Sequence, residues 1–184
     1  MKIYLAPLEG ITGYTYRRAL HQCFGGFDKY FIPFILPNQK GHLSTREKKD
    51  IAPENNEGMY AVPQILTKNA EDFIRTAETL QEYGYNEVNL NLGCPSKTVV
   101  TKGRGTLRNP ALAREIRGGA PASKEEIRRF HDIMYNEYCE DLSGDRNILF
   151  RMKELWSYLI PMFTNNKKYA KKIKKPRNVL YMKV

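Results

Sequence analysis

The first half of the chain contains four short apolar segments with a strand-like pattern of hydrophobic and polar positions. In the first and fourth segments apolar residues alternate with polar ones, which is typical of a strand with one buried face. The second segment is almost continuously apolar, which is typical of a strand covered on both faces. We therefore predict four β-strands. The segments are residues 3–5, 30–35, 60–66 and 87–92.

Helical patterns separate these strands. Residues 14–23 predict a helix with Arg17 and Arg18 on its outer side, and Asn69 is an N-cap candidate for a helix whose apolar residues recur at helical spacing. Residues 38–57 are expected to be a polar excursion. Strands that alternate with helices predict a parallel sheet, and the chemistry of such sheets collects at the carboxyl ends of the strands. Those ends are residues 6–10, Gln64 and residues 93–96.

After Gly105 the pattern becomes entirely helical. Asn109-Pro110 precedes a short helix over residues 111–116, and Ser123-Lys124-Glu125-Glu126 is a capping box. A further helix is expected over residues 148–159, with Met152, Leu155, Trp156 and Leu159 facing inward. The sequence thus predicts an α/β domain over residues 1–105 and an all-α domain over residues 106–184.

Composition narrows the class of protein. The 184 residues are 41% hydrophobic and 27% charged, which fits a soluble globular protein. No stretch approaches the ~18 apolar residues of a membrane span, and Pro7 breaks the N-terminal pattern too early for a signal peptide, so we expect a cytoplasmic protein. The three cysteines form no CxxC pair, so neither a disulfide framework nor a metal site is expected.

Charge is distributed unevenly along the chain. Residues 1–105 hold 13 Lys and Arg against 11 Asp and Glu, whereas residues 106–184 hold 17 against 9, which gives the second part a net charge of +8. Residues 167–177 contain no acidic residue. Such a segment attracts a polyanion, nucleic acid first of all, but a solvated basic tail explains the same pattern.

Four positions are candidates for chemistry. Cys94 follows a strand directly, so its thiol is either reactive at the mouth of the sheet or a small buried hydrophobe. Gln64 and Asn91 end apolar strands, and each needs a partner, because burying an unpaired amide costs about 1–3 kcal/mol. Gly103-Arg104-Gly105 suits either a phosphate site or an ordinary turn.

Four motifs follow one another along the chain: Leu5-Ala6-Pro7-Leu8-Glu9-Gly10-Ile11-Thr12, Gln64, Asn89-Leu90-Asn91-Leu92-Gly93-Cys94-Pro95-Ser96-Lys97 and Lys102-Gly103-Arg104-Gly105. Taken together, they resemble the motifs of the tRNA-dihydrouridine synthases. The resemblance implies a (β/α)8 barrel that binds FMN, with NADPH as the reductant. It also implies hydride transfer to C6 of a tRNA uridine, protonation of C5 by a cysteine, and a helical domain that holds the tRNA.

The resemblance also assigns roles to individual residues. Cys94 matches the proton donor, and Asn91 matches a polar contact near the target base, which must be extruded from its stack. Within the cofactor site, Pro7 and Leu8 would lie against the flavin and the Gln64 amide would bond its ring edge. The expected cofactor-binding residues are Pro7, Leu8, Gln64, Gly103 and Arg104.

The chain departs from the family in length. A complete barrel takes about 250 residues and eight strands, but only four strands are expected before residue 105. Residues 101–110 read like a fusion of two GRG motifs that lie far apart in the family. We therefore expect a partial TIM-type barrel of about four βα units, followed by an all-α domain.

A partial barrel leaves two sheet edges and, we expect, an apolar interior face open to water. A second copy could complete the barrel as a homodimer, the helical segment could cover the sheet, or the chain could be a poorly folding deletion product. Two functions follow. One is an active tRNA-dihydrouridine synthase, and the alternative is a catalytically inactive remnant that binds tRNA through its basic helical domain.

Overall fold

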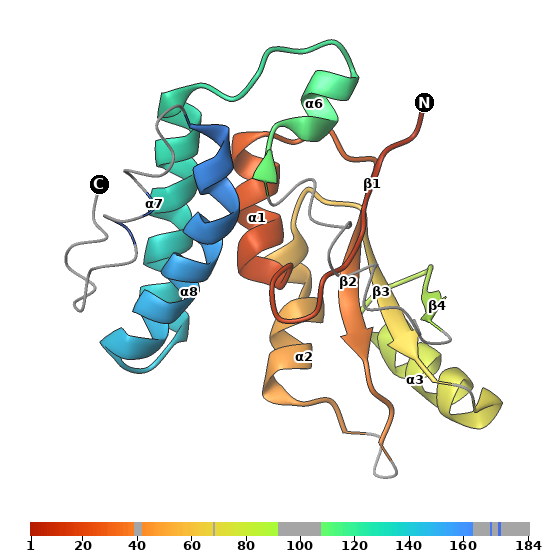
Figure 1. Ribbon diagram of the computed structural model, residues 1–184. Helices are drawn as coiled ribbons and strands as arrows, with labels where there is room; N and C mark the ends of the chain where they lie inside the picture. The colour runs from red at the N-terminus through yellow and green to blue at the C-terminus, as the bar shows by residue number, and fades with distance from the viewer. Residues whose placement is uncertain (39–41, 68, 92–107, 164–169, 171–172, 174–184) are drawn as a thin grey trace. The chain divides into compact units, whose positions relative to one another are not determined.

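The computed structural model (Figure 1) describes residues 1–38, 42–67, 69–91, 108–163, 170 and 173. The chain forms two compact units. The first comprises Met1–His21 and Phe27–Gly103, and the second comprises Gln22–Gly26 and Arg104–Val184. The domain ranges expected from sequence, 1–105 and 106–184, stay a prediction, because their boundary falls outside the described residues.

The first unit is built on a four-stranded parallel sheet in the order β1-β2-β3-β4, with helices between successive strands. This confirms the predicted α/β fold, a partial TIM-type barrel followed by a helical part. Its elements are β1 (Tyr4–Leu5), α1 (Tyr14–Cys23), β2 (Lys29–Ile35), α2 (Thr45–Ile51), the 3-10 helix η1 (Pro53–Asn56), β3 (Ala61–Leu66), α3 (Ala70–Glu82) and β4 (Asn89–Asn91).

One apolar cluster joins the sheet to two of its helices. Ile32 and Ile35 of β2 and Ile65 of β3 pack with Ile51 of α2 and Leu80 of α3, each at most 1% exposed. The register between β2 and β3 shifts between Ile32 and Ile35. Residues three apart in a regular strand point to opposite faces, so this irregularity lets both side chains reach the same cluster.

Helix α2 lies inside the segment that was expected to be only a polar excursion. It begins at a capping box in which the Ser44 hydroxyl accepts from the Glu47 N–H and the Glu47 carboxylate accepts from the Ser44 N–H. Only Asp50 and Ile51 of the helix are buried. An amphipathic pattern is therefore almost absent, although the Ser-x-x-Glu signature was present in the sequence.

Helix α3 begins as predicted. The Asn69 side chain accepts hydrogen bonds from the N–H groups of Glu71 and Asp72, which caps the helix. Thr76 and Leu80 are buried on its inner side. The helix therefore starts and packs where the sequence placed it.

The described residues of the second unit form helices joined by short connections, as predicted. Ser123 and Glu126 form the expected capping box, and α7 buries Ile127, Phe130 and Met134. Helix α8 buries Met152, Leu155 and Leu159 as expected, while Trp156 is only half-buried. The elements are α6 (Leu112–Ile116), α7 (Lys124–Asp141), α8 (Asp145–Leu159) and the 3-10 helix η2 (Ile160–Met162).

An aromatic pair ties the short segment Gln22–Gly26 to this helical unit. Phe24 is 7% exposed and meets Phe130 of α7 edge-on, with ring centroids 5.7 Å apart. Helices α7 and α8 pack side by side (Figure 1). Across the described part of the chain, no helix combines the length and apolar character needed to cross a membrane.

Candidate functional site

Three amide side chains form a hydrogen-bonded chain at β3 and β4. Gln64 Nε2 donates to Asn89 Oδ1 at 2.8 Å, and Asn91 Nδ2 donates to Gln64 Oε1 at 2.9 Å. Gln64 lies directly opposite Asn89 in the parallel register. Since alternate residues of a strand share a face, Asn91 lies on the same face as Asn89 and within reach of Gln64.

This amide chain explains how Gln64 is tolerated at 9% exposure in the sheet. An unpaired buried amide costs about 1–3 kcal/mol, and here both polar atoms of the side chain have a partner. The sequence predicted that Gln64 and Asn91 each need a partner, but it did not single out Asn89. The alternation of asparagines around Leu90 was the signal that could have identified it.

A second polar cluster lies on the same face of the sheet, toward the amino ends of the strands. Lys29 Nζ lies 2.6 Å and 2.7 Å from the two Glu87 carboxylate oxygens, and the Tyr60 hydroxyl donates to the same carboxylate at 2.8 Å. Hydrogen bonds from Lys29 and then Tyr60 lower the pKa of Glu87, and the bond to Glu87 raises the pKa of Lys29.

These two clusters correct the expectation of an apolar interior face. Lys29 and Phe31 share a face, Phe31 lies opposite Val62, and Val62 shares a face with Gln64. This face therefore carries Val62 and Phe31 between polar groups that satisfy one another. The physical reason is that polar side chains from different strands hydrogen-bond one another across this face.

The loop after β1 is held by one threonine. The Thr12 hydroxyl accepts from the Leu8 N–H at 2.7 Å and donates to the Leu8 carbonyl at 3.2 Å. The Ile11 and Thr12 N–H groups donate to the same carbonyl at 3.0 Å. Pro7 and Leu8 are half-buried at the start of this turn. Leu8 is therefore fixed within its own loop.

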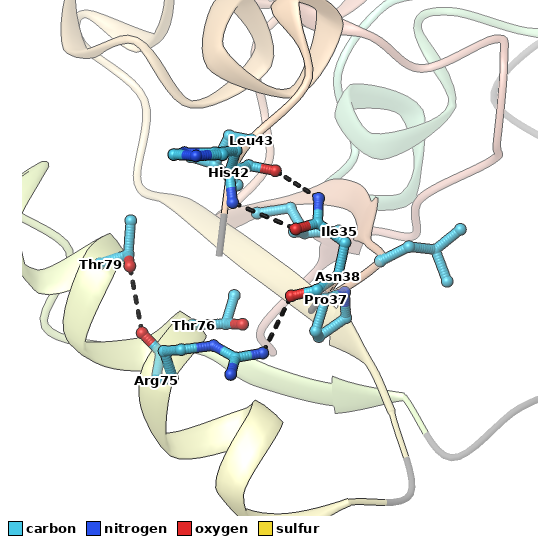
Figure 2. Close-up of a pocket in the computed structure, with 9 residues that line it drawn as sticks. Ile35, Pro37, Asn38, His42, Leu43, Arg75, Thr76 and Thr79 are labelled. Atoms are coloured by element: carbon cyan, nitrogen blue, oxygen red, sulfur yellow. Dashed lines mark hydrogen bonds between the residues drawn. The ribbon is translucent and has the colours of Figure 1, made fainter. Parts of the chain in front are cut away.

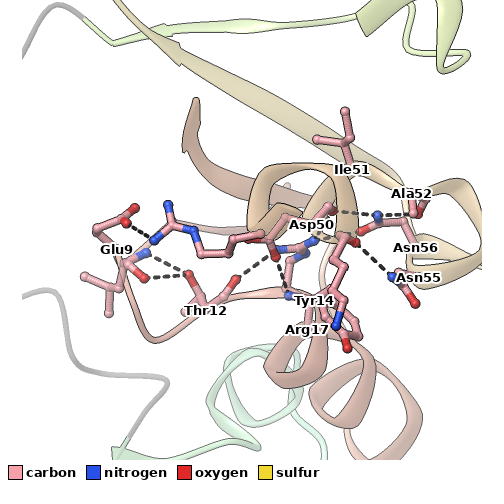
Figure 3. Close-up of polar contacts among 12 residues, drawn as sticks. Glu9, Thr12, Tyr14, Arg17, Asp50, Ile51, Ala52, Asn55 and Asn56 are labelled. Atoms are coloured by element: carbon pink, nitrogen blue, oxygen red, sulfur yellow. Dashed lines mark hydrogen bonds and ion pairs between the residues drawn. The ribbon is translucent and has the colours of Figure 1, made fainter. Parts of the chain in front are cut away.

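A buried arginine anchors the far end of the same loop. Arg17 Nη1 donates to the Thr12 carbonyl at 2.9 Å, and Nη2 donates to the Asp50 carbonyl at 2.7 Å and to Asn56 Oδ1 at 3.0 Å (Figure 3). Arg17 is 0% exposed. The expectation that it lies on the outer side of α1 is wrong, because carbonyl and carboxylate acceptors from α2 and η1 replace water around it.

Asp50 connects this arginine to the start of α1. Its Oδ1 accepts from the Tyr14 N–H at 2.6 Å and lies 3.4 Å from Arg17 Nη1. Burial raises the pKa of Asp50, and the charge of Arg17 opposes that rise. Burial also lowers the pKa of Arg17, which the Asp50 charge opposes. The network stabilises the loop that carries Pro7 and Leu8.

A small hollow lies beside the segment that follows β2. It encloses about 10 Å³, enough for about one water molecule. Asn38 and His42 bond across it at 2.6 Å and 3.2 Å, and Arg75 reaches the Asn38 carbonyl at 3.0 Å (Figure 2). The hollow is therefore too small for a substrate, and its polar groups fix the segment after β2.

Three of the expected site residues, Cys94, Gly103 and Arg104, lie outside the described residues. Among those described, the structure brings Gln64 and Asn91 together in the amide chain, and it places Pro7 and Leu8 at the carboxyl end of β1. The individual roles of all these residues stay predictions.

Comparison with known proteins identifies similar sequences. The family model described as dihydrouridine synthase (Dus) matches residues 4–118. The tRNA-dihydrouridine synthase B of Pasteurella multocida is 30% identical over 117 residues, which cover 62% of this chain and 34% of that protein. A probable tRNA-dihydrouridine synthase of Staphylococcus aureus (strain COL) is 28% identical over 157 residues, with coverages of 76% and 47%.

A third relative is the tRNA-dihydrouridine(16) synthase of Pseudomonas putida. It is 33% identical over 136 residues, which cover 67% of this chain and 41% of that protein. The chain spans between about a third and a half of the length of the curated relatives it matches.

Proposed function

Because this chain belongs to the dihydrouridine synthase family, we propose that it reduces uridine in tRNA to 5,6-dihydrouridine. The observation that carries the proposal is the contact between Gln64 and Asn91 at 2.9 Å. The resemblance assigns one of these amides to the cofactor and the other to the target base. Both groups must meet at the reacting atoms, so their side chains should be adjacent.

The described residues suit a flavin. The Gln64 amide can form four hydrogen bonds, of which two are used by Asn89 and Asn91. One N–H and one lone pair can therefore serve the alternating donors and acceptors of a flavin ring edge. Pro7 and Leu8 would lie against the ring, and Gly103 and Arg104 would hold its phosphate. When bound, FMN would supply the hydride for C6 of uridine, and NADPH would reduce the flavin again.

Cys94 completes the reduction as the proton donor. As hydride adds to C6, the electrons of the C5–C6 double bond take a proton at C5 from the Cys94 thiol, and the thiolate is later reprotonated from water. A thiol is a competent general acid near neutral pH. The role depends on one atom, so substitution of Cys94 should abolish product formation.

The helical part, residues 106–184, would hold the tRNA. Its net charge is +8. Lys124, Arg128 and Arg129 of α7 and Arg146 of α8 are exposed. Contacts from such residues to phosphates would hold the tRNA while the target base leaves its stack.

A second candidate function rests on the sheet. Within the described residues β1 pairs only with β2 and β4 only with β3, so the two outer strands end the sheet. If the barrel does not close, the chain is a catalytically inactive remnant that binds tRNA through its helical part. A homodimer in which two copies complete one barrel would restore the first function.

The visible absorbance of the purified chain and its mass in solution distinguish these two functions. The chain is purified without added cofactor, and its visible spectrum, its mass in solution and its dihydrouridine formation on unmodified tRNA are measured. Bound flavin with turnover that Cys94→Ala abolishes and Cys139→Ala, at an exposed position in α7, retains would support the enzyme. A colourless chain that FMN cannot reconstitute, but that binds tRNA, would support the remnant.

A further inference from the structure

The amide chain has a direction, and its last member has no assigned role. Asn91 donates to Gln64, and Gln64 donates to Asn89, so Asn89 is the terminal acceptor. We propose that Asn89 is a positioning residue that sets which end of the Gln64 amide faces Asn91. The proposal rests on the proposed function, because the Gln64 amide matters to catalysis only if it contacts the flavin.

The strand geometry places both partners of the Gln64 amide. Asn89 is directly opposite Gln64 in the register, and Asn91 lies two residues further along the same face of β4. Gln64 Nε2 points to Asn89, and Gln64 Oε1 points to Asn91. Turning the Gln64 amide alone by 180° would bring Gln64 Oε1 against Asn89 Oδ1, and two carbonyl oxygens cannot form a hydrogen bond, so Gln64 can reverse only together with Asn89.

The direction has a chemical consequence for a ring-edge contact. A flavin edge presents donors and acceptors at fixed positions, and a reversed glutamine would place a donor against a donor. At 9% exposure water does not readily compensate for such a mismatch. An acceptor at position 89 thus pre-organises Gln64 for its ligand without touching that ligand.

Two variants at position 89 distinguish the effect of losing the hydrogen-bond acceptor from the effect of changing the side-chain packing. Asn89→Asp keeps an oxygen that accepts from Gln64 Nε2, whereas Asn89→Leu keeps a similar volume and removes the acceptor. Asn86→Leu is the matched control, because Asn86 is an exposed asparagine outside the amide chain. The first readout needs no cofactor: the exchange rate of the Gln64 side-chain amide protons, measured by NMR on the full chain.

We expect Asn89→Leu to speed that exchange by about 5- to 10-fold, the equivalent of one lost hydrogen bond, while Asn89→Asp and Asn86→Leu change it less than about twofold. The second readout is the dissociation constant of FMN, which should rise about 5- to 10-fold in Asn89→Leu and recover in Asn89→Asp. Because Asn89→Asp is close to isosteric, it remains informative if Asn89→Leu does not fold.

The outcomes separate the two proposals. Unchanged exchange in Asn89→Leu, or equal losses in Asn89→Asp and Asn89→Leu, would overturn the positioning role, whatever the flavin does. Normal exchange behaviour in a chain that binds no FMN would instead overturn the proposed function and support the ordering of Gln64 by Asn89.

Discussion

Arg17 of α1 and Asp50 of α2 form a buried ion pair, with 3.4 Å between Nη1 and Oδ1. The pair is separated by more than thirty residues in sequence, and it holds the loop after β1 through the bond from Arg17 to the Thr12 carbonyl. Removing one partner would leave the other charge buried without compensation, which costs about 3–5 kcal/mol.

The first prediction concerns the stability of this pair. Arg17→Met should lower the free energy of unfolding by about 3–5 kcal/mol, because Asp50 and two backbone carbonyls lose their donor. Urea unfolding followed by circular dichroism measures the loss. Lys48→Met, at an exposed position of α2, is the control and should change little. Equal midpoints for the two variants would mean that the arginine network does not stabilise the fold.

The second prediction concerns the loop turn. Thr12→Val removes both bonds between the Thr12 hydroxyl and Leu8, so it should destabilise the chain by about 1–2 kcal/mol. Thr12→Ser keeps the hydroxyl and should retain most of that stability. Thermal unfolding of the two variants provides the comparison. A loss in Thr12→Ser as large as that in Thr12→Val would show that the methyl group, not the hydroxyl, maintains the turn.

The third prediction concerns pH. Glu126 is held ionised by two hydrogen bonds from Arg114 and by the Ser123 N–H, which lower the pKa of its carboxyl from 4.5 to about 2. A lowered folded pKa stabilises the chain above the unfolded pKa, and this stability is lost as pH falls from about 4.5 to about 2. The side chain is 31% exposed, so the contribution is about 1 kcal/mol.

Glu126→Gln isolates the charge, because a glutamine can still complete the capping box. The variant should be about 1 kcal/mol less stable than the natural chain above pH 5, and the difference should shrink toward pH 2. Denaturant unfolding across this range measures it. A difference that stays constant with pH would argue against the ionised pairing with Arg114.

For several elements a local pattern in the sequence was sufficient to predict the structure. The strands, the Asn69 cap and the Ser123 capping box could be predicted because each depends on neighbouring residues. Arg17 was placed on the wrong side of α1, because its acceptors come from Asp50 and Asn56, distant in sequence. Local charge predicts exposure, and only the packed fold shows that the charge is compensated.

The candidate site was likewise only partly predictable from the sequence. Gln64 and Asn91 could be identified as polar residues at strand ends, since the alternation is visible in the sequence. The link between them, and the part of Asn89 in it, depends on the register of β3 and β4. A shift of that register by one residue would turn Asn89 and Asn91 to the other face, so no pattern within either strand could have fixed the contact.

The last prediction concerns the salt dependence of tRNA binding. If phosphate contacts from the helical part hold tRNA, the affinity for tRNA should fall steeply as the salt concentration rises. Each phosphate neutralised should add about 0.9 to the steepness of the logarithm of affinity plotted against the logarithm of salt concentration. Arg128→Gln with Arg129→Gln removes two exposed charges of α7 and should lower that slope by up to about 2. Arg75→Gln is the control, because Arg75 lies in α3, outside the helical part. Filter binding between about 50 and 200 mM salt gives the slopes. A slope unchanged in the double variant would place the tRNA contacts elsewhere, and an affinity independent of salt would exclude phosphate contacts as the basis of binding.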